Sequence, residues 1–224
     1  MIEIKLQTIA KLDELAQKAF ESYFASANEK TYALKEICDF IPGYSYKGEE
    51  LKESTTGMIS IKCIERENGF RKEGIKSLCP IKEIPNEKRC DINDILVCHT
   101  DLTKNQDIIG RPILIPTNGG YASLTYSMDL VKVSPISNKF SKALIFRILN
   151  SKFFKKHALG FCSGTTVVHL NKKALQTYHF NGPSQDFEKL SKNLQNYQNQ
   201  IIILTSEIDI LEKQKALLLA KYFS

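Results

Sequence analysis

The side chains that could carry out chemistry in this sequence are scattered along the chain. The six cysteines stand at positions 38, 63, 79, 90, 98 and 162, and no two of them form a Cys-x-x-Cys pair. Reduced thiols, several of them in the core, are therefore expected, as in a cytoplasmic protein. A zinc site built from Cys90, Cys98 and His99 would have a ligand spacing that fits no common template, so we expect no metal ion.

The sequence also lacks the motifs of the common enzyme classes. It contains no Gly-x-Gly-x-x-Gly, no phosphate-binding glycine-rich loop, no Gly-x-Ser-x-Gly turn and no His-Glu-x-x-His. The Asn/Asp-Pro-Pro-Tyr/Phe motif of amino-methyltransferases is absent as well. Paired carboxylates such as Glu49-Glu50 lie beside lysine or arginine, which is typical of a solvated surface. We therefore expect neither catalytic residues nor a cofactor, and a nuclease or methyltransferase acting alone is the alternative.

Positive charge is concentrated in one part of the chain. The net formal charge is +6, and residues 130–184 contain nine Lys and Arg residues but no Asp or Glu. So long a stretch without a carboxylate favours an anionic partner, with double-stranded DNA first. The lysines of this stretch that we expect to contact phosphates are Lys142, Lys152, Lys155, Lys156, Lys172 and Lys173.

Four predicted loops combine polar, basic and aromatic side chains around residues 44–47, 66–71, 100–105 and 163–166. Such side chains make the phosphate contacts and base-edge hydrogen bonds with which proteins hold and read DNA. Arg111, between Gly110 and Pro112, is as compatible with a structural turn as with DNA contact. The candidate DNA-binding residues outside the lysine set are Tyr44, Tyr46, Lys47, Arg66, Asn68, Arg71, Thr100, Lys104, Asn105, Arg111, Ser163, Gly164, Thr165 and Thr166.

A long helix is predicted over residues 187–222. Apolar residues recur there at alternating intervals of three and four, which is the heptad pattern of a coiled coil. A shorter helix with a similar stripe is predicted over residues 3–27. An uncovered apolar seam needs a partner, so we expect a homodimer or pairing with a second fragment of the same kind. The residues expected at this interface are Leu194, Tyr197, Ile201, Leu204, Ile208 and Leu211.

The sequence between the two helices predicts a mixed block. Short β-rich runs bounded by Gly and Pro are expected as strands at 58–64, 94–98, 112–116, 130–133 and 165–170, and residues 141–158 predict one helix. The predicted fold class is α+β, with one globular mixed α/β domain between a short N-terminal helix and a long C-terminal coiled-coil helix. The three expected segments are residues 1–27, residues 28–184 and residues 185–224.

The two ends of the sequence repeat one another. LDELAQKAFESYF at 12–24 aligns without a gap with LEKQKALLLAKYF at 211–223, and both stretches end in Tyr-Phe. The separation of the copies is too long for a solenoid repeat. This pattern indicates one copy of a large unit with the same helix end at both of its edges.

Three stretches resemble the specificity (S) subunit of type I restriction–modification enzymes. They are DINDILVCHTDLTKNQDIIGRPILIP (91–116), LGFCSGTTVVHLNKKAL (159–175) and IIILTSEIDILEKQKALLLAKYF (201–223). In that family each of two target-recognition domains is followed by a long conserved helix, and the two helices pack antiparallel. A chain with one such domain between the end of the preceding helix and its own helix would show one helix ending twice.

The resemblance implies a non-catalytic subunit that reads one half of a bipartite DNA site. It also implies docking of methyltransferase subunits, which bind S-adenosylmethionine, and a restriction subunit can join them. A full S subunit has two recognition domains, so this chain is either a half-subunit that dimerises or a piece of a longer or split protein. No apolar stretch is long enough for a membrane span. A coiled-coil adaptor without DNA binding is the remaining alternative.

Overall fold

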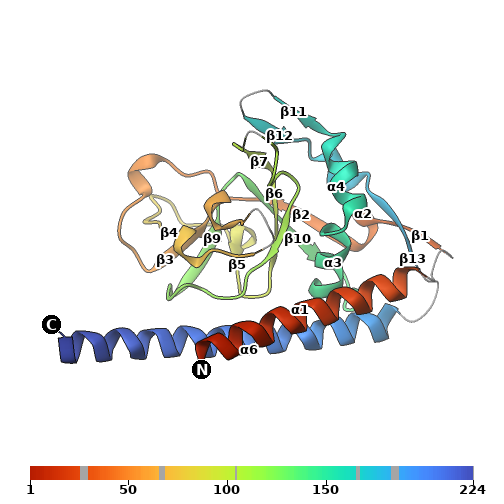
Figure 1. The fold of residues 1–224 in the computed structure, drawn as a ribbon. Coiled ribbons are helices and arrows are strands. Elements are labelled where there is room, and N and C mark those ends of the chain that lie inside the picture. Colours follow the sequence, from red (N-terminus) through yellow and green to blue (C-terminus); the bar gives the residue numbers. More distant parts are fainter. Residues whose placement is uncertain (26–29, 66–68, 104, 165–166, 183–186, 224) are drawn as a thin grey trace.

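Two helices lie side by side along one edge of a mixed α/β body in the computed structural model (Figure 1). The structure describes residues 1–25, 30–65, 69–103, 105–164, 167–182 and 187–223. The helices are α1 (Ile2–Ala25) and α6 (Phe187–Phe223). They run antiparallel, because Lys5 Nζ lies 2.5 Å from Glu207 Oε2 while Phe24 packs against Phe187 at the other end. The α+β fold class and both terminal helices are thus confirmed.

An apolar seam joins the helix pair. Ala16 and Phe20 of α1 are buried, and α6 buries Leu194, Ile201 and Ile208. The seam has the three-four spacing of a coiled coil, and the long C-terminal helix fits that structure. Of the six residues expected to face another chain, those three are covered within this chain, while Tyr197, Leu204 and Leu211 are half-buried.

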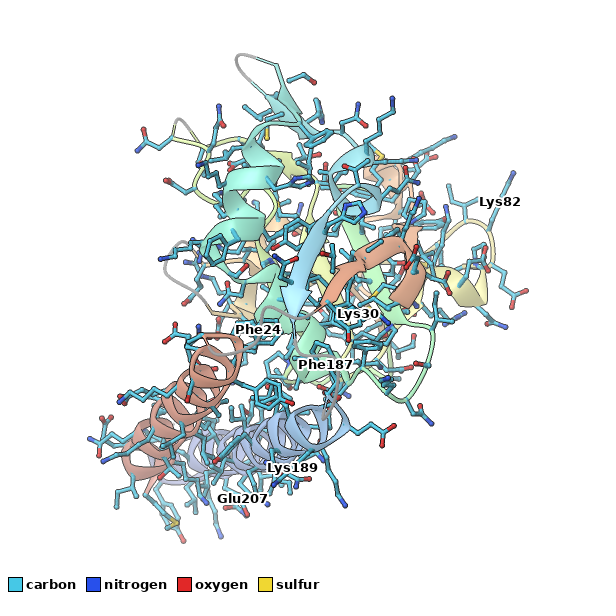
Figure 2. The ribbon with its side chains drawn as sticks, turned by 90° about the vertical axis from the view of Figure 1, so that its right-hand side faces the viewer. Phe24, Lys30, Lys82, Phe187, Lys189 and Glu207 are labelled. Carbon is cyan, nitrogen blue, oxygen red and sulfur yellow. The ribbon has the colours of Figure 1, made fainter. Side chains whose placement is uncertain are left out.

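An aromatic cluster joins the helix pair to the body where α1 ends and α6 begins. The ring centroid of Phe187 lies 4.9 Å from that of Tyr32 and 5.3 Å from that of Phe140. Figure 2 shows Phe24 and Phe187 at this junction. The neighbouring sheet pairs β1 (Lys30–Ala33) with β13 (His179–Gly182) antiparallel. A Cβ on Gly182 would stand 2.7 Å from the Phe187 ring, so glycine is required for this close packing.

The centre of the body is a four-stranded antiparallel sheet in the order β2-β10-β6-β8. All four residues of β6 are buried, because Ile95 and Val97 face one hydrophobic core while Leu96 and Cys98 face the other. A continuous apolar run is what a strand covered on both faces requires. The strands are β2 (Cys38–Pro42), β6 (Ile95–Cys98), β8 (Pro112–Leu114) and β10 (Leu130–Pro135).

A second four-stranded sheet, in the order β4-β3-β9-β5, contains the parallel pair β3 and β9. The strand predicted over 58–64 ends at Ile59, which is a correction. Ser60 accepts a hydrogen bond from the backbone N–H of Lys62 and begins a 3-10 turn there. The strands are β3 (Thr56–Ile59), β4 (Lys76–Ser77), β5 (Arg89–Cys90) and β9 (Ser123–Tyr126), and the 3-10 turns are Gly48–Glu50, Ile61–Cys63, Lys72–Gly74 and Asn86–Lys88.

The single helix predicted over 141–158 is two helices, which is a second correction. Asn150 ends the first helix, and Ser151 caps the second by accepting a hydrogen bond from the N–H of Phe154. The apolar pattern continues through the break, so periodicity alone missed it. The remaining helices are α2 (Leu34–Ile37), α3 (Lys142–Leu149), α4 (Lys152–Leu159) and α5 (Lys173–Gln176).

A three-stranded sheet lies at the end of the body away from the helix pair (Figure 1). Its order is β11-β12-β7, and both pairings are antiparallel. The strands are β7 (Thr100–Asp101), β11 (Cys162–Ser163) and β12 (Val168–Leu170). No helix of the described segments is long and apolar enough to cross a membrane.

Candidate nucleic-acid interface

The three-stranded sheet brings two of the predicted loops together. Ser163 pairs with His169, and His169 pairs with Thr100 on the next strand. Thr100 Oγ1 and His169 Nδ1 are 3.4 Å apart. Ser163 and His169 are exposed, whereas Thr100 is buried. Thr100 was expected to contact DNA, but its burial leaves it a supporting role under His169.

A buried aspartate fixes the loop that follows β7. Asp101 is 0% exposed, and its carboxylate accepts hydrogen bonds from the backbone N–H groups of Thr103 (2.6 Å), Ile108 (2.8 Å) and Ile109 (2.8 Å). Burial tends to raise the pKa of Asp101, but these hydrogen bonds outweigh it and lower that pKa. The carboxylate therefore holds the loop that carries exposed Asn105.

Lys155 ties the same loop to α4. Its ammonium group donates to the carbonyl oxygens of Gln106 (3.0 Å) and Ile109 (2.8 Å). Burial, together with the nearby charge of Arg111, lowers the pKa of Lys155. Lys155 was expected to contact phosphate, and in this structure its ammonium group is engaged with the loop instead of standing free. Arg111 itself donates from Nη2 to Asp107 O at 3.4 Å, which supports the structural-turn alternative for it.

Gly164 begins the turn between β11 and β12. Its φ is +105°, and a Cβ there would stand 2.1 Å from Val167 O. The turn itself therefore requires glycine, whether or not DNA approaches the backbone.

Exposed lysines lie on the segments that adjoin this sheet along the chain. Lys152 and Lys156 lie on α4, which leads into β11, and Lys172 and Lys173 follow β12. All four are exposed, as phosphate contacts require. Lys142 differs, because its ammonium group lies 2.6 Å from the Asp94 carboxylate. Lys142 is thus already paired within the body, and its expected phosphate contact stays a prediction.

His99, the residue before Thr100, is half-buried next to the three-stranded sheet. Burial, aided by the positive charges of His169 and Lys172, lowers the pKa of His99 and outweighs the opposing charge of Asp129. The imidazole of His99 is therefore neutral near pH 7.

The loop around Tyr44 lies elsewhere in the body. Tyr44 donates a hydrogen bond to Glu50 at 2.9 Å, and Tyr44 and Tyr46 pack against a small core that contains Met58. Lys47 is exposed. The two tyrosines thus have structural contacts of their own, and the structure does not bring this loop to the three-stranded sheet.

The loop around Arg71 lies near the helix pair. Arg71 Nε is 3.8 Å from Glu65 Oε1. The next residue, Lys72, contacts α6, so this loop also lies apart from the three-stranded sheet. Arg66, Asn68, Lys104, Thr165 and Thr166, which the sequence also suggested, lie outside the described residues.

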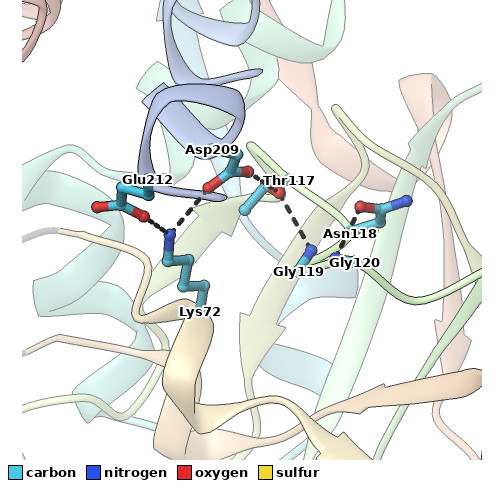
Figure 3. Close-up of polar contacts among 7 residues, drawn as sticks. All are labelled: Lys72, Thr117, Asn118, Gly119, Gly120, Asp209 and Glu212. Carbon is cyan, nitrogen blue, oxygen red and sulfur yellow. Dashed lines mark hydrogen bonds and ion pairs between the residues drawn. The ribbon is translucent and has the colours of Figure 1, made fainter. Parts of the chain in front are cut away.

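A polar contact between α6 and the body is a feature that sequence reasoning missed (Figure 3). Lys72 Nζ lies 2.9 Å from Asp209 Oδ1 and also pairs with Glu212. Asp209 accepts a second hydrogen bond, at 2.6 Å, from Thr117. Glu212 and Asp209 together outweigh partial burial and raise the pKa of Lys72. These contacts fix the direction of α6 relative to the body; the only signal in the sequence was two acidic residues one helical turn apart.

The fold and this surface define a class of protein without reference to any relative. A mixed α/β body carries an exposed, lysine-flanked β-ribbon at one end and an antiparallel helix pair along the opposite edge (Figure 1). In the described residues no three His, Cys, Asp or Glu side chains come together as a metal site would need.

Comparison with solved structures finds chains of similar fold. The chain is similar to the type I restriction–modification S subunit from M. genitalium, with a TM-score of 0.58, 16% identity, and coverage of 100% of this chain and 58% of that chain. At that identity the likeness establishes the fold. No protein-family model and no curated protein sequence matches.

Two further structures are similar over nearly the whole chain. The HsdS subunit from Thermoanaerobacter tengcongensis gives a TM-score of 0.49 at 14% identity, covering 99% of this chain and 53% of that one. A structure described as showing assembly and conformational transition of the type I R-M system gives 0.49 at 15% identity, covering 96% and 51%. The chain thus spans between 51% and 58% of the length of the three.

Proposed function

We propose that this chain is a DNA-recognition module of a type I restriction–modification system and reads one half of a bipartite site. The fold likeness to the M. genitalium S subunit is the observation that carries the proposal. The exposed lysines around the three-stranded sheet support it, because duplex DNA needs positive charge and reading groups on one surface. The chain itself would have no catalytic role.

The same proposal gives the helix pair two roles. The apolar seam of α6 continues to Leu218 and Tyr222, which are 56% and 67% exposed, beyond the part that α1 covers. We propose that a second copy covers it, placing two recognition domains at opposite ends of the pair. Ile203 and Ile210, seven residues apart on α6, are also exposed. They offer a separate apolar stripe on which a methyltransferase subunit would dock.

Selection of bound sequences from a random duplex library tests the recognition role. We expect two short half-sites, palindromic for a homodimer, with unread bases between them and their centres one or more helical turns, about 34 Å each, apart. A single continuous site would contradict the paired arrangement. No selective binding at all would favour the adaptor, and cleavage or methyl transfer by the purified chain alone would favour the enzyme.

The lysines give a second prediction. Replacing Lys156 or Lys173 by alanine should weaken binding to cognate and non-cognate duplexes alike and reduce the salt slope by about one, because each lysine would neutralise one phosphate. Fluorescence anisotropy at several salt concentrations measures both quantities. Lys82 is the matched control, because it is exposed and lies on a loop outside the three-stranded sheet (Figure 2). An unchanged salt slope in both variants would remove these lysines from the interface.

A further inference from the structure

His169 is exposed in the middle of a strand whose other two residues are buried. Val168 and Leu170, on either side, are 4% and 1% exposed and face the core. Strand alternation therefore turns the His169 ring outward from the body. An imidazole held on a strand has fewer conformations to lose on binding than a lysine on a helix surface.

One neighbour of His169 on the sheet supports its ring, and the other is exposed beside it. Buried Thr100 lies beside it with Oγ1 3.4 Å from His169 Nδ1, and exposed Ser163 lies beside it on the outer strand. Thr100 is in turn the residue before Asp101, whose buried carboxylate fixes the following loop. The His169 ring therefore lies on a part of the sheet that these buried contacts hold in place.

The surroundings of His169 fit a DNA groove. β11 and β12 form an antiparallel hairpin, the β11–β12 ribbon, at one edge of the three-stranded sheet, with β7 on the other side of β12, and some DNA-binding proteins place β-strands of a sheet in a groove. Exposed Lys156 and Lys172 lie on the elements that precede and follow the ribbon, where they can meet the phosphates on either side of a groove. The ribbon also lies at the end of the body away from the helix pair (Figure 1).

We propose that His169 is a base-reading residue, presented with Ser163 on the β11–β12 ribbon to the major groove, and that Thr100 positions its ring. The inference rests on the proposed DNA-recognition function. When the Thr100 hydroxyl donates to Nδ1, the ring proton is on Nε2, which then donates a hydrogen bond. The acceptors it would meet in the major groove are N7 of a purine, O6 of guanine and O4 of thymine. Guanine presents two of these acceptors side by side, so we expect His169 to read one purine, guanine, in each half-site.

Selection from a random duplex library with the full-length chain and with His169→Ala tests this inference. We expect the variant to lose its preference at one purine position of each half-site, with cognate affinity lower on the order of 10-fold. Affinity for non-cognate duplex and the salt slope should stay unchanged, because a contact to a base edge, unlike one to a phosphate, releases no counterions. Thr100→Val should weaken the same base preference and no other.

His179→Ala is the matched control, because His179 is also exposed on a strand but belongs to the β1–β13 sheet. A variant that selects the same sequences as the unaltered chain would overturn the inference while the recognition function stands. An equal loss on all duplexes would also overturn it, since His169 would then serve phosphate. If the unaltered chain selects no sequence, the proposed function fails and the inference fails with it. Circular dichroism melting of each variant separates loss of reading from loss of fold.

Discussion

Replacing Asp101 by alanine should lower the free energy of unfolding by about 3 kcal/mol, because several buried N–H groups lose their common acceptor. The carboxylate is fully buried and accepts from Thr103, Ile108 and Ile109. Urea denaturation at pH 7 measures the loss. Asp39→Ala, a change at an exposed aspartate on β2, should alter stability by less than about 0.5 kcal/mol.

The same carboxylate predicts a pH dependence. Because folding lowers the pKa of Asp101, its contribution to stability is fully present above the usual aspartate range. That contribution is lost as the pH falls through the lowered pKa of the folded state. The stability difference between the unaltered chain and Asp101→Asn should therefore be largest near neutral pH and shrink in acid. A difference that stays constant down to strongly acidic pH would contradict this role.

DNA binding should weaken in Asp101→Ala even where the chain remains folded. The loop that Asp101 fixes contains exposed Asn105, and Lys155 of α4 is held to the carbonyls of the same loop. Loss of the Asp101 carboxylate would therefore displace both Asn105 and Lys155. Binding to the selected sequence should fall more than binding to unrelated duplex, since a phosphate contact tolerates loop displacement better than a base contact does.

Regular periodicity made some parts of this fold predictable from the sequence. The three-four spacing identified α1 and α6, and short β-rich runs identified β6 and β10. The break at Ser151 was missed because apolar spacing continues across it, although a serine three residues before Phe154 is a possible cap. Strands β7 and β11 have only two residues each, which is too short for any pattern.

The candidate site was less predictable because it depends on contacts between distant residues. Thr100 and His169 are 69 positions apart, and no pattern in the sequence predicts that they lie together. Lys142 and Lys155 look like the other lysines of the acid-free stretch, yet Asp94 engages one and loop carbonyls engage the other. Composition therefore located the basic region, whereas only the structure separates the exposed lysines from those that are paired within the body.

The second large effect concerns assembly through α6. Lys5, in the first turns of α1, pairs with Glu207, so the last turns of α6 extend past α1 (Figure 1). Leu218 lies on that extension in continuation of the buried seam. In a two-fold dimer one substitution introduces two charges into the same apolar contact. We therefore expect Leu218→Asp to raise the dimer dissociation constant by at least about 100-fold, since burying unpaired charge is strongly unfavourable.

Analytical ultracentrifugation at micromolar concentrations measures the change in assembly. Ile203→Asp is the matched control, because Ile203 is 49% exposed and lies outside the seam on the stripe proposed for the methyltransferase subunit. It should leave the dimer intact. A strict monomer at tens of micromolar for the unaltered chain, or a dimer that survives Leu218→Asp, would contradict assembly through the extension. Pairing only with a second specificity fragment would replace the homodimer with a heterodimer on the same seam, and Leu218→Asp should then abolish that pairing as well.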